Sequence, residues 1–253
     1  MHPVLFRIGS FPIALYGVMI AVGMIIAVFL VLRLARRVGI KDEAVIDIVF
    51  YSVIAGMIGA RILYIIVNFE DFVNHPLFYI FNRQGFVLWG AILGASPVVY
   101  YMIKKKGLAL NISLDLAAVG LILAQAFGRI GCFFNGCCYG IEAPAGFPLG
   151  LALPHDALRH PAQLYSASLL FAIFVILRVW QDKKRFDGEI FLGYCMLYSV
   201  KRFSVEFLRG DNPRILLGLT LSQVISVFLL AVALLLFISR YRRWKKKIST
   251  GSK

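Results

Sequence analysis

Two arginines and a tyrosine are the residues of this sequence best suited to hold an anion. Tyr198, Arg202, Glu206 and Arg209 follow one another at intervals of four, four and three residues, so they share one face of a helix. Arg129 ends a separate apolar segment. A guanidinium offers a planar fork of donors that suits a phosphate. We expect Arg129 and Arg202 to face one cavity with the Tyr198 hydroxyl; the alternative is a structural ion pair of Glu206 with Arg202 or Arg129.

The segment 128–140, which reads GRIGCFFNGCCYG, is rich in glycine. Each glycine weakens a helix interior by about 0.5–1 kcal/mol, so repeated use indicates close approach of the backbone to a neighbouring helix or to a ligand. Asn135-Gly136 is a turn dipeptide. We therefore expect the helix that carries Arg129 to break near Asn135 and the chain to re-enter as a loop.

Three of the four cysteines, Cys132, Cys137 and Cys138, fall in this segment. With His155 or His160 they could bind zinc, but the spacing is not the usual Cys-x2-Cys pair, and we expect no metal. A disulfide between Cys132 and Cys137 or Cys138 is favoured over zinc, because the segment is expected on an oxidising face. Buried unpaired thiols are the commonest alternative.

The elements that must position these residues are apolar runs of membrane-spanning length. The chain has 253 residues, 60% of them hydrophobic, and about 20 apolar residues in a helix cross roughly 30 Å of hydrocarbon. We predict an all-α fold, a polytopic membrane helix bundle of about seven transmembrane helices. The predicted spans are residues 11–32, 45–68, 86–103, 114–134, 163–180, 189–208 and 219–239.

The placement of positive charge predicts the topology. The formal net charge is +14, and the basic residues gather in short segments between or after the apolar runs. These segments are 33–41, 104–106, 178–185 and 240–247. Because such segments stay cytoplasmic, we expect the N-terminus outside, the C-terminus in the cytoplasm and no nucleic-acid partner.

The same layout predicts one transmembrane domain, residues 1–240, and a basic cytoplasmic tail, residues 241–253, whose end is disordered. The predicted outer loops are 69–85, 135–162 and 209–218. Lys201 and Arg209, near the end of a span, are expected to snorkel to the membrane surface.

The sequence resembles the prolipoprotein diacylglyceryl transferases of bacterial membranes over nearly its whole length. The family signature begins Gly-Arg-x-Gly, continues through Phe-x-Asn-Gly and closes with Gly. The residues that match it are Gly128, Arg129, Gly131, Phe133, Asn135, Gly136 and Gly140. Further family positions are Tyr16-Gly17, Gly59-Ala60-Arg61, Gly85, Gly90, Asp115, residues 159–165, the run from Tyr198 to Arg209, and Ser222-Gln223.

Four positions depart from the family pattern. The family typically has a His-Gly pair in the third span, and that His has been discussed as the catalytic base, whereas this chain has Trp89-Gly90. Cys132 stands where the signature usually has Asn, and Cys137 where it usually has Glu. Ser166 replaces the Glu that follows Gln-Leu-Tyr.

The resemblance implies a multi-pass enzyme of the bacterial cytoplasmic (inner) membrane. It implies transfer of the diacylglyceryl group of phosphatidylglycerol to the lipobox cysteine thiol in a prolipoprotein signal peptide, the first step of lipoprotein maturation. The product is a thioether, glycerol phosphate leaves, and no cofactor is implied. Arg129 and Arg202 would stabilise the leaving phosphate. Because the thiol must lose its proton to attack, we favour Tyr198 and the arginine charges for that step, with Glu206 or Asp115 as weaker proton acceptors.

The resemblance also implies a set of residues that bind the lipid and the peptide. They are Arg129, Tyr16, Arg61, Asn135, Gly140, Gln163, Tyr165 and Glu206. His160 is expected to be structural. Three alternatives remain. One is a family relative that uses the same lipid site on another acceptor, and another is a non-catalytic lipid-binding or transport protein, although the internal repeats common in transporters are not found. The third is a membrane thiol oxidoreductase built on the cysteines, which lack a Cys-x-x-Cys pair.

Overall fold

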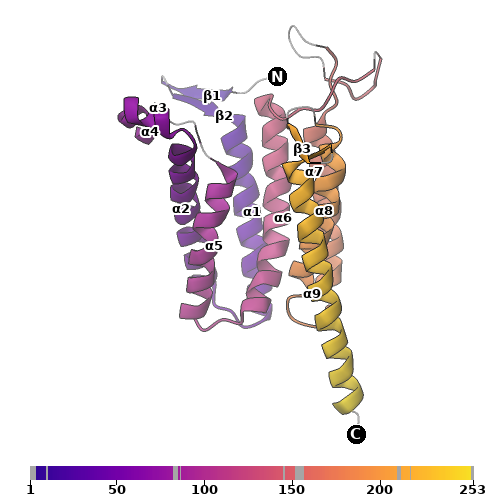
Figure 1. Cartoon of the computed structure of the whole chain (residues 1–253). Coiled ribbons are helices and arrows are strands. Elements are labelled where there is room, and N and C mark those ends of the chain that lie inside the picture. The colour runs from indigo at the N-terminus through magenta and orange to yellow at the C-terminus, as the bar shows by residue number, and fades with distance from the viewer. Residues whose placement is uncertain are drawn as a thin grey trace. The chain divides into compact units, whose positions relative to one another are not determined.

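The computed structural model describes residues 4–9, 11–81, 85, 87–144, 146–151, 157–209, 212–216 and 218–251. Seven of the helices in these ranges have 18 residues or more. They are α1 (Leu15–Arg37), α2 (Asp42–Val67), α5 (Leu88–Lys105), α6 (Leu110–Asn135), α7 (Ala162–Gln181), α8 (Glu189–Glu206) and α9 (Leu221–Gly251), all shown in Figure 1. Each predicted span coincides with one of these helices, which confirms the all-α class.

The remaining elements are short. Two helices, α3 (Phe69–Asn74) and α4 (Pro76–Phe81), lie in the segment predicted as the first outer loop. Strands β1 (Val4–Ile8) and β2 (Phe11–Ala14) form one antiparallel hairpin, and β3 (Arg214–Leu216) and β4 (Leu219–Thr220) form another. The hairpins take the first residues of two predicted spans, so α1 begins at residue 15 rather than 11 and α9 at residue 221 rather than 219.

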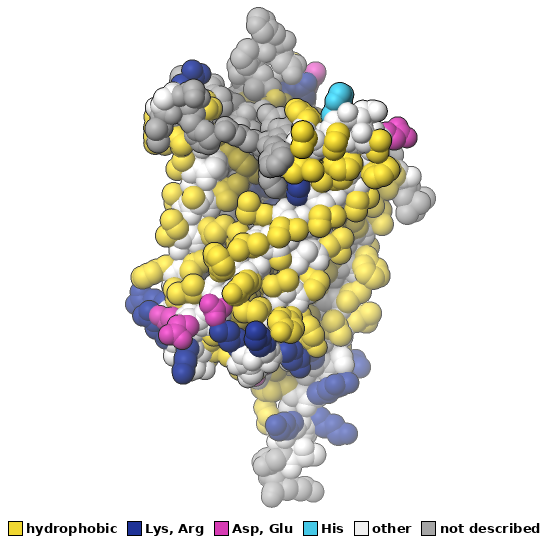
Figure 2. Space-filling model, turned by 90° about the vertical axis from the view of Figure 1, so that its left-hand side faces the viewer, with side chains coloured by type: hydrophobic (Ala, Val, Ile, Leu, Met, Phe, Trp, Pro, Cys, Tyr) yellow, Lys and Arg dark blue, Asp and Glu magenta, His cyan; other side chains and the backbone are white. Residues whose placement is uncertain are grey.

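Five helices, α1, α2, α6, α7 and α9, are long and apolar enough to cross a membrane, by length and composition. Helices α5 and α8 fall short of that measure. Two lysines end α5, and α8 carries four charged residues, among them Lys201 and Arg202. Figure 2 shows hydrophobic side chains covering one face of the helices, with Lys and Arg gathered at their lower end. The chain is a multi-pass membrane protein; that all seven long helices cross stays a prediction.

The basic tail predicted at residues 241–253 is not an irregular segment, because α9 continues through it to Gly251. From Leu221 to Thr250 the sequence contains neither glycine nor proline, and lysine and arginine are good helix formers. The expectation of disorder at the end of the chain is therefore wrong as far as residue 251.

The chain folds as two compact units. One comprises Leu32–Ser113, and the other comprises Met1–Val31 together with Leu114–Lys253. In the first unit α2 and α5 lie side by side (Figure 1). A β-carbon on Gly59 or Gly90 would collide with the carbonyl oxygen of the other, and one on Gly94 would lie 2.5 Å from the Ala55 carbonyl oxygen. Small residues thus bring two helix backbones into direct contact, as membrane helices commonly do.

In the larger unit α8 packs between α7 and α9 (Figure 1), and α6 supplies a long buried face. Asp115, 1% exposed, holds the start of α8 to α6. Its carboxylate accepts hydrogen bonds from the backbone N–H of Gly188 at 2.9 Å and of Phe191 at 3.0 Å, and pairs with Lys184 at 3.0 Å. A buried carboxylate that is fully partnered in this way fixes two helices to each other.

Candidate functional site

Helices α6 and α8 bring the predicted arginines together within the larger unit. Arg129, Lys201, Arg202 and Arg209 act on one another's charges, and Glu206 is the carboxylate that acts on the same group. We call these five residues the cationic cluster. Its formal charge is strongly positive, in a part of the protein where charges are costly. An anionic ligand would offset this excess positive charge.

Glu206 is the fixed point of the cluster, with 2% of its surface exposed. Its Oε2 pairs with Arg202 Nη1 at 2.9 Å, and its Oε1 accepts hydrogen bonds from Asn212 Nδ2 at 2.6 Å and Thr220 Oγ1 at 2.9 Å. Arg202 also donates from Nη2 to Ser222 Oγ at 2.7 Å. The structural ion pair considered from the sequence is therefore present. Glu206 positions Arg202, and both of its carboxylate oxygens already have partners.

Arg129 differs from Arg202 in having no such partner. It is half-buried, and it makes no hydrogen bond or ion pair with any residue that the structure describes. A half-buried guanidinium keeps its full charge and its donors. Among the described residues, Arg129 is therefore a cation of the cluster whose donors are free to bind an anion.

Lys201 is a member of the cluster that the sequence assigned wrongly. Snorkelling would place its ammonium in water, but only 4% of the residue is exposed. Its Nζ instead lies over the ring of Tyr198, 5.3 Å from the centroid, where the negative ring face attracts a cation. The sequence signal for this placement is the pair Lys201-Arg202 within one apolar run. Tyr198 itself lies beside the ring of Tyr194, with centroids 5.7 Å apart.

Asp115 is excluded as a proton acceptor for this site. It precedes Arg129 by fourteen residues on the same helix, which is about 20 Å along the axis. Its carboxylate is occupied at the start of α8, as described above. The expectation that it might act on the thiol proton was wrong, because the sequence does not show which end of a helix a buried carboxylate serves.

The segment that follows α6 is held by several of the predicted binding residues. Gln163, 1% exposed, donates from Nε2 to the Cys137 carbonyl at 2.7 Å. The Gly140 N–H donates to the His160 carbonyl at 2.8 Å, and a β-carbon on Gly140 would lie 2.6 Å from the Leu208 carbonyl oxygen. The Tyr165 hydroxyl lies 3.3 Å from His160 Nδ1. These residues shape the loop, and the purely structural role expected for His160 stays a prediction.

Tyr16 and Asn135 stand at the open side of the same loop. Tyr16, in the first turn of α1, packs on the backbone of Gly131 and keeps 39% of its surface exposed. Its hydroxyl lies within electrostatic range of Arg129 and the three cysteines. Asn135 is exposed at the end of α6, two residues before Cys137. A contact of either residue with substrate stays a prediction.

The three cysteines form a compact group, with all three Sγ atoms within 4.8 Å of one another. They are free thiols here, and a disulfide among them stays a prediction. Hydrogen bonding from Cys132 lowers the pKa of Cys138 to about 5, against the effect of burial and with help from Arg209 and Arg129. Burial raises the pKa of Cys137.

Arg61 and Trp89 belong to the smaller unit. Arg61 donates from Nη1 to the Gly85 carbonyl at 3.2 Å and lies over the ring of Tyr64, 5.5 Å from its centroid. Trp89 is 48% exposed near the start of α5. The predicted part of Arg61 in substrate binding stays a prediction.

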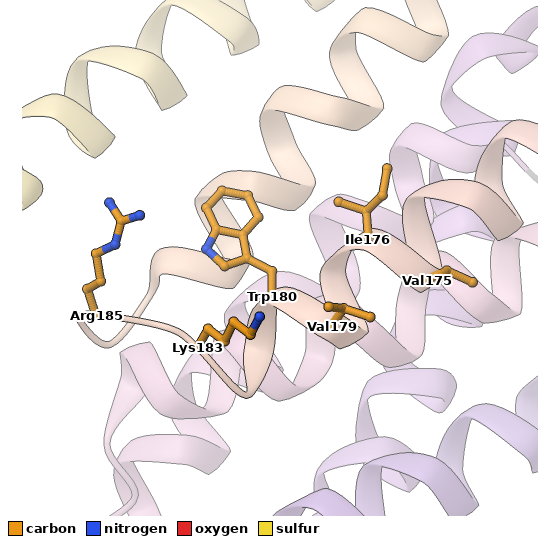
Figure 3. A pocket seen from close by; sticks show the side chains of 6 residues that line it. All are labelled: Val175, Ile176, Val179, Trp180, Lys183 and Arg185. Carbon is orange, nitrogen blue, oxygen red and sulfur yellow. The ribbon is translucent and has the colours of Figure 1, made fainter.

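A shallow apolar groove lies at the other end of the larger unit. Its lining residues are Val175, Ile176, Val179, Trp180, Lys183 and Arg185, shown in Figure 3. Trp180 follows Gln163 by seventeen residues on α7, about 25 Å along the axis. The groove is therefore no part of the site at the end of α6.

These features define a class: a multi-pass membrane protein with a partly buried cluster of cationic side chains at the end of a helix. A family model described as Prolipoprotein diacylglyceryl transferase matches residues 3–239. The chain belongs to this family.

Named relatives align along nearly the whole chain. The chain is 36% identical over 250 residues to the phosphatidylglycerol–prolipoprotein diacylglyceryl transferase of Clostridium tetani (strain Massachusetts / E88), covering 96% of this chain and 100% of that one. It is 36% identical over 262 residues to the transferase 2 of Clostridium perfringens (strain 13 / Type A), covering 100% of both. It is 30% identical over 273 residues to the Enterococcus faecalis (strain ATCC 700802 / V583) transferase, covering 99% and 98%.

Proposed function

We propose that this chain transfers the diacylglyceryl group of phosphatidylglycerol to the lipobox cysteine thiol of a prolipoprotein signal peptide. The relatives named above carry both substrates in their names. The observation that carries the proposal is Arg129, a half-buried guanidinium within a cationic cluster and without a partner among the described residues. The phosphodiester of a membrane lipid has the negative charge that such a guanidinium binds, and it lies near the membrane surface.

The reaction makes one bond and breaks one. The sulfur of the acceptor attacks the glycerol carbon that bears the phosphate, the C–S bond forms, and the C–O bond breaks. The electron pair of that bond goes to the phosphate oxygen, glycerol phosphate leaves, and the thiol proton passes to solvent. Because negative charge grows on the leaving phosphate, a preplaced Arg129 stabilises the transition state more than the bound lipid.

The other members of the cluster prepare this site. Glu206 holds Arg202, whose remaining donors can face the phosphate, and the Tyr198 hydroxyl lies on the same helix one turn earlier. Gln163 and Gly140 fix the loop through which the acceptor peptide reaches the cluster. Arg61 and Tyr16 are proposed to contact the lipid or the peptide.

The membrane placement is part of the proposal. All seven long helices cross the bacterial cytoplasmic (inner) membrane as one transmembrane domain, the N-terminus faces outward, and the basic end of α9 lies in the cytoplasm. The short α5 and the charged α8 are accommodated because their polar residues are covered by neighbouring helices. The end of α6 then lies at the outer leaflet.

The test is a reconstituted transfer assay. Purified protein in nanodiscs of phosphatidylglycerol receives a lipobox peptide, and mass spectrometry detects the diacylglyceryl thioether and free glycerol phosphate. A peptide with Ser in place of the lipobox Cys, and nanodiscs of phosphatidylcholine, are the controls. Glycerol phosphate without thioether would instead favour a different acceptor, and lipid binding without either product would favour a non-catalytic protein. Complementation of a strain depleted of its own transferase tests the same activity in cells.

A further inference from the structure

We propose that Cys132, Cys137 and Cys138 bind one zinc ion as thiolates, and that the acceptor thiol becomes its fourth ligand. The lipobox cysteine would thus lose its proton to the metal site rather than to a basic side chain. The inference rests on the proposed transfer reaction for its substrate. It replaces the expectation of no metal drawn from the cysteine spacing.

The distances between the sulfur atoms suit such a site. The three Sγ atoms lie within 4.8 Å of one another. Zinc–sulfur bonds of about 2.3 Å in a tetrahedron place ligand sulfurs about 3.8 Å apart. The group therefore closes around a zinc ion when the sulfurs move by about 1 Å or less, which is within reach of small side-chain rotations.

The backbone is bent to bring the sulfurs together. Cys138 has φ +65°, and among the described residues it is the one non-glycine with positive φ. A turn that served only to reverse the chain would favour glycine there, as at Gly136 with φ +69°. The conformation is held in place because Cys137 N–H donates to the Cys132 carbonyl at 3.2 Å and Gln163 holds the Cys137 carbonyl. Strain kept by surrounding contacts is typical of functional sites.

The donor set and the charge both favour zinc over a disulfide. Thiolates are the soft ligands that zinc prefers, and a disulfide would use two sulfurs of a three-sulfur group. No His, Asp or Glu within the described ranges joins the group as a fourth ligand, and His155 lies outside those ranges. Three thiolates and one zinc ion carry a net charge of −1, which Arg129 and Arg209 offset, since both act on the Cys138 thiol.

An open fourth position is what the reaction needs. Zinc with three protein ligands keeps a place for substrate, and a thiol that binds there is deprotonated outright. No carboxylate of the cluster competes for this task, because Glu206 is occupied by Arg202, Asn212 and Thr220. The acceptor R–SH would bind zinc as R–S⁻ and release its proton to water.

The zinc-bound sulfur then attacks in the geometry that the helix provides. Cys132 follows Arg129 by three residues on α6, so both face the same side. The sulfur attacks the glycerol carbon, and the electron pair of the C–O bond goes to the phosphate held by Arg129. The thioether product carries no charge, is a poor zinc ligand, and leaves the metal open for the next thiol.

The test uses the whole protein in phosphatidylglycerol nanodiscs, purified with a phosphine reductant and zinc. Elemental analysis should find one zinc ion per chain. Cys132→Ser, Cys137→Ser and Cys138→Ser should each lose it, whereas Cys195→Ser, a buried cysteine outside the group, should keep it. Cys138→Gly removes the ligand and suits the positive φ, so it should bind no zinc and unfold at the same temperature as the zinc-free parent or higher. That variant separates loss of metal from loss of fold.

Cobalt in place of zinc reports on the fourth ligand. The thiolate-to-cobalt absorption should grow by about one third when a lipobox peptide adds a fourth sulfur to three, and should not grow with the Ser peptide. Removing zinc with a chelator should slow thioether formation about 100-fold or more, the usual worth of general-base assistance, and zinc should restore it.

Each other outcome overturns the inference. A metal-free protein with full turnover, or a disulfide in the active protein found by mass spectrometry, leaves no role for zinc. Bound cobalt that does not respond to the peptide thiol makes the metal structural only. The proposed function fails separately: a cobalt site that responds to the peptide, in a zinc-loaded protein that yields no thioether, would sink the transfer reaction and keep the metal site.

Discussion

Replacing Arg129 by Gln should remove catalysis and leave the fold intact. The guanidinium has no hydrogen bond or ion pair among the described residues, so its loss leaves no buried partner unsatisfied. It also relieves repulsion with Lys201 and Arg202. We therefore expect the free energy of unfolding to stay the same or to rise.

The expected catalytic loss follows from the position of the charge. Removing one preplaced donor that stabilises an oxyanion costs about 10²–10³ in kcat, or about 2.7–4 kcal/mol. Arg129→Lys should recover only part of this loss, because a single ammonium cannot form the two parallel bonds of a guanidinium. KM for phosphatidylglycerol should rise less than kcat falls.

Arg202→Gln is the informative comparison. It strips a carboxylate that is 2% exposed of its ion pair, and breaking a buried pair typically costs about 3–5 kcal/mol of stability. Arg178→Gln is the matched control, because Arg178 pairs with Asp182 at 2.8 Å on the surface. This pair lies in the last turn of α7, far from Gln163 in the first turn. That control should alter neither stability nor turnover appreciably.

The assay combines thioether formation in nanodiscs with thermal unfolding of the same samples. We expect four distinct results: Arg129→Gln stable and slowed about 10²–10³-fold, Arg129→Lys stable and less slowed, Arg202→Gln destabilised, and Arg178→Gln like the parent. An Arg129→Gln protein within threefold of parental turnover, or one that unfolds as easily as Arg202→Gln, would refute this expectation.

Three further predictions concern the elements around the site. Asp115→Ala should lower the free energy of unfolding by about 3–5 kcal/mol, which thermal unfolding measures. Burial lowers the pKa of Lys184, but its hydrogen bonds to Asp187 and Asp115 raise it more. The stabilisation from the Lys184–Asp115 ion pair should therefore hold at neutral pH and be lost only as the pH rises past about 10.5. Gly59→Ala should cost about 1–3 kcal/mol, whereas Gly56→Ala on the same helix, where the new β-carbon would lie 3.5 Å from its nearest neighbour, should cost little; equal losses would contradict the close crossing of α2 and α5. Lys201→Met keeps the volume and removes a buried like charge, so it should raise stability while raising KM for phosphatidylglycerol about tenfold, and an unchanged KM would confine Lys201 to a structural role.

The long helices were predictable because the length of each apolar run can be counted in the sequence. Their ends were less so: Gly9, with φ +59°, turns the first residues back as a hairpin, and the expected start of a helix at residue 11 was lost to β2. At the other end, α9 runs on through the basic segment to Gly251, although the last five residues were expected to be disordered. Local hydrogen bonding decides such boundaries, and hydropathy does not report it.

The candidate site was also only partly predictable from the sequence. Residue type and spacing were enough to place Arg202 and Glu206 on one face of a helix, and the ion pair between them was foreseen as an alternative. Spacing could not show that Lys201 turns inward onto the ring of Tyr198, or that Asp115 serves the far end of its helix. Both depend on which neighbouring helix covers which face, and that is set by tertiary packing.

The glycine-rich end of α6 lets two other elements pack closely against one short segment. Gly131 lets α1 pack against the helix at Tyr16, and Gly140 ties the following loop to the end of α8. Between these two contacts the chain must turn sharply, and it does so with a cysteine in a conformation that glycine would adopt more easily. Glycine would fit that turn with less strain. The Cys138 sulfur is instead a ligand that the proposed zinc site requires, and the Arg129 guanidinium is the group proposed to meet the phosphate.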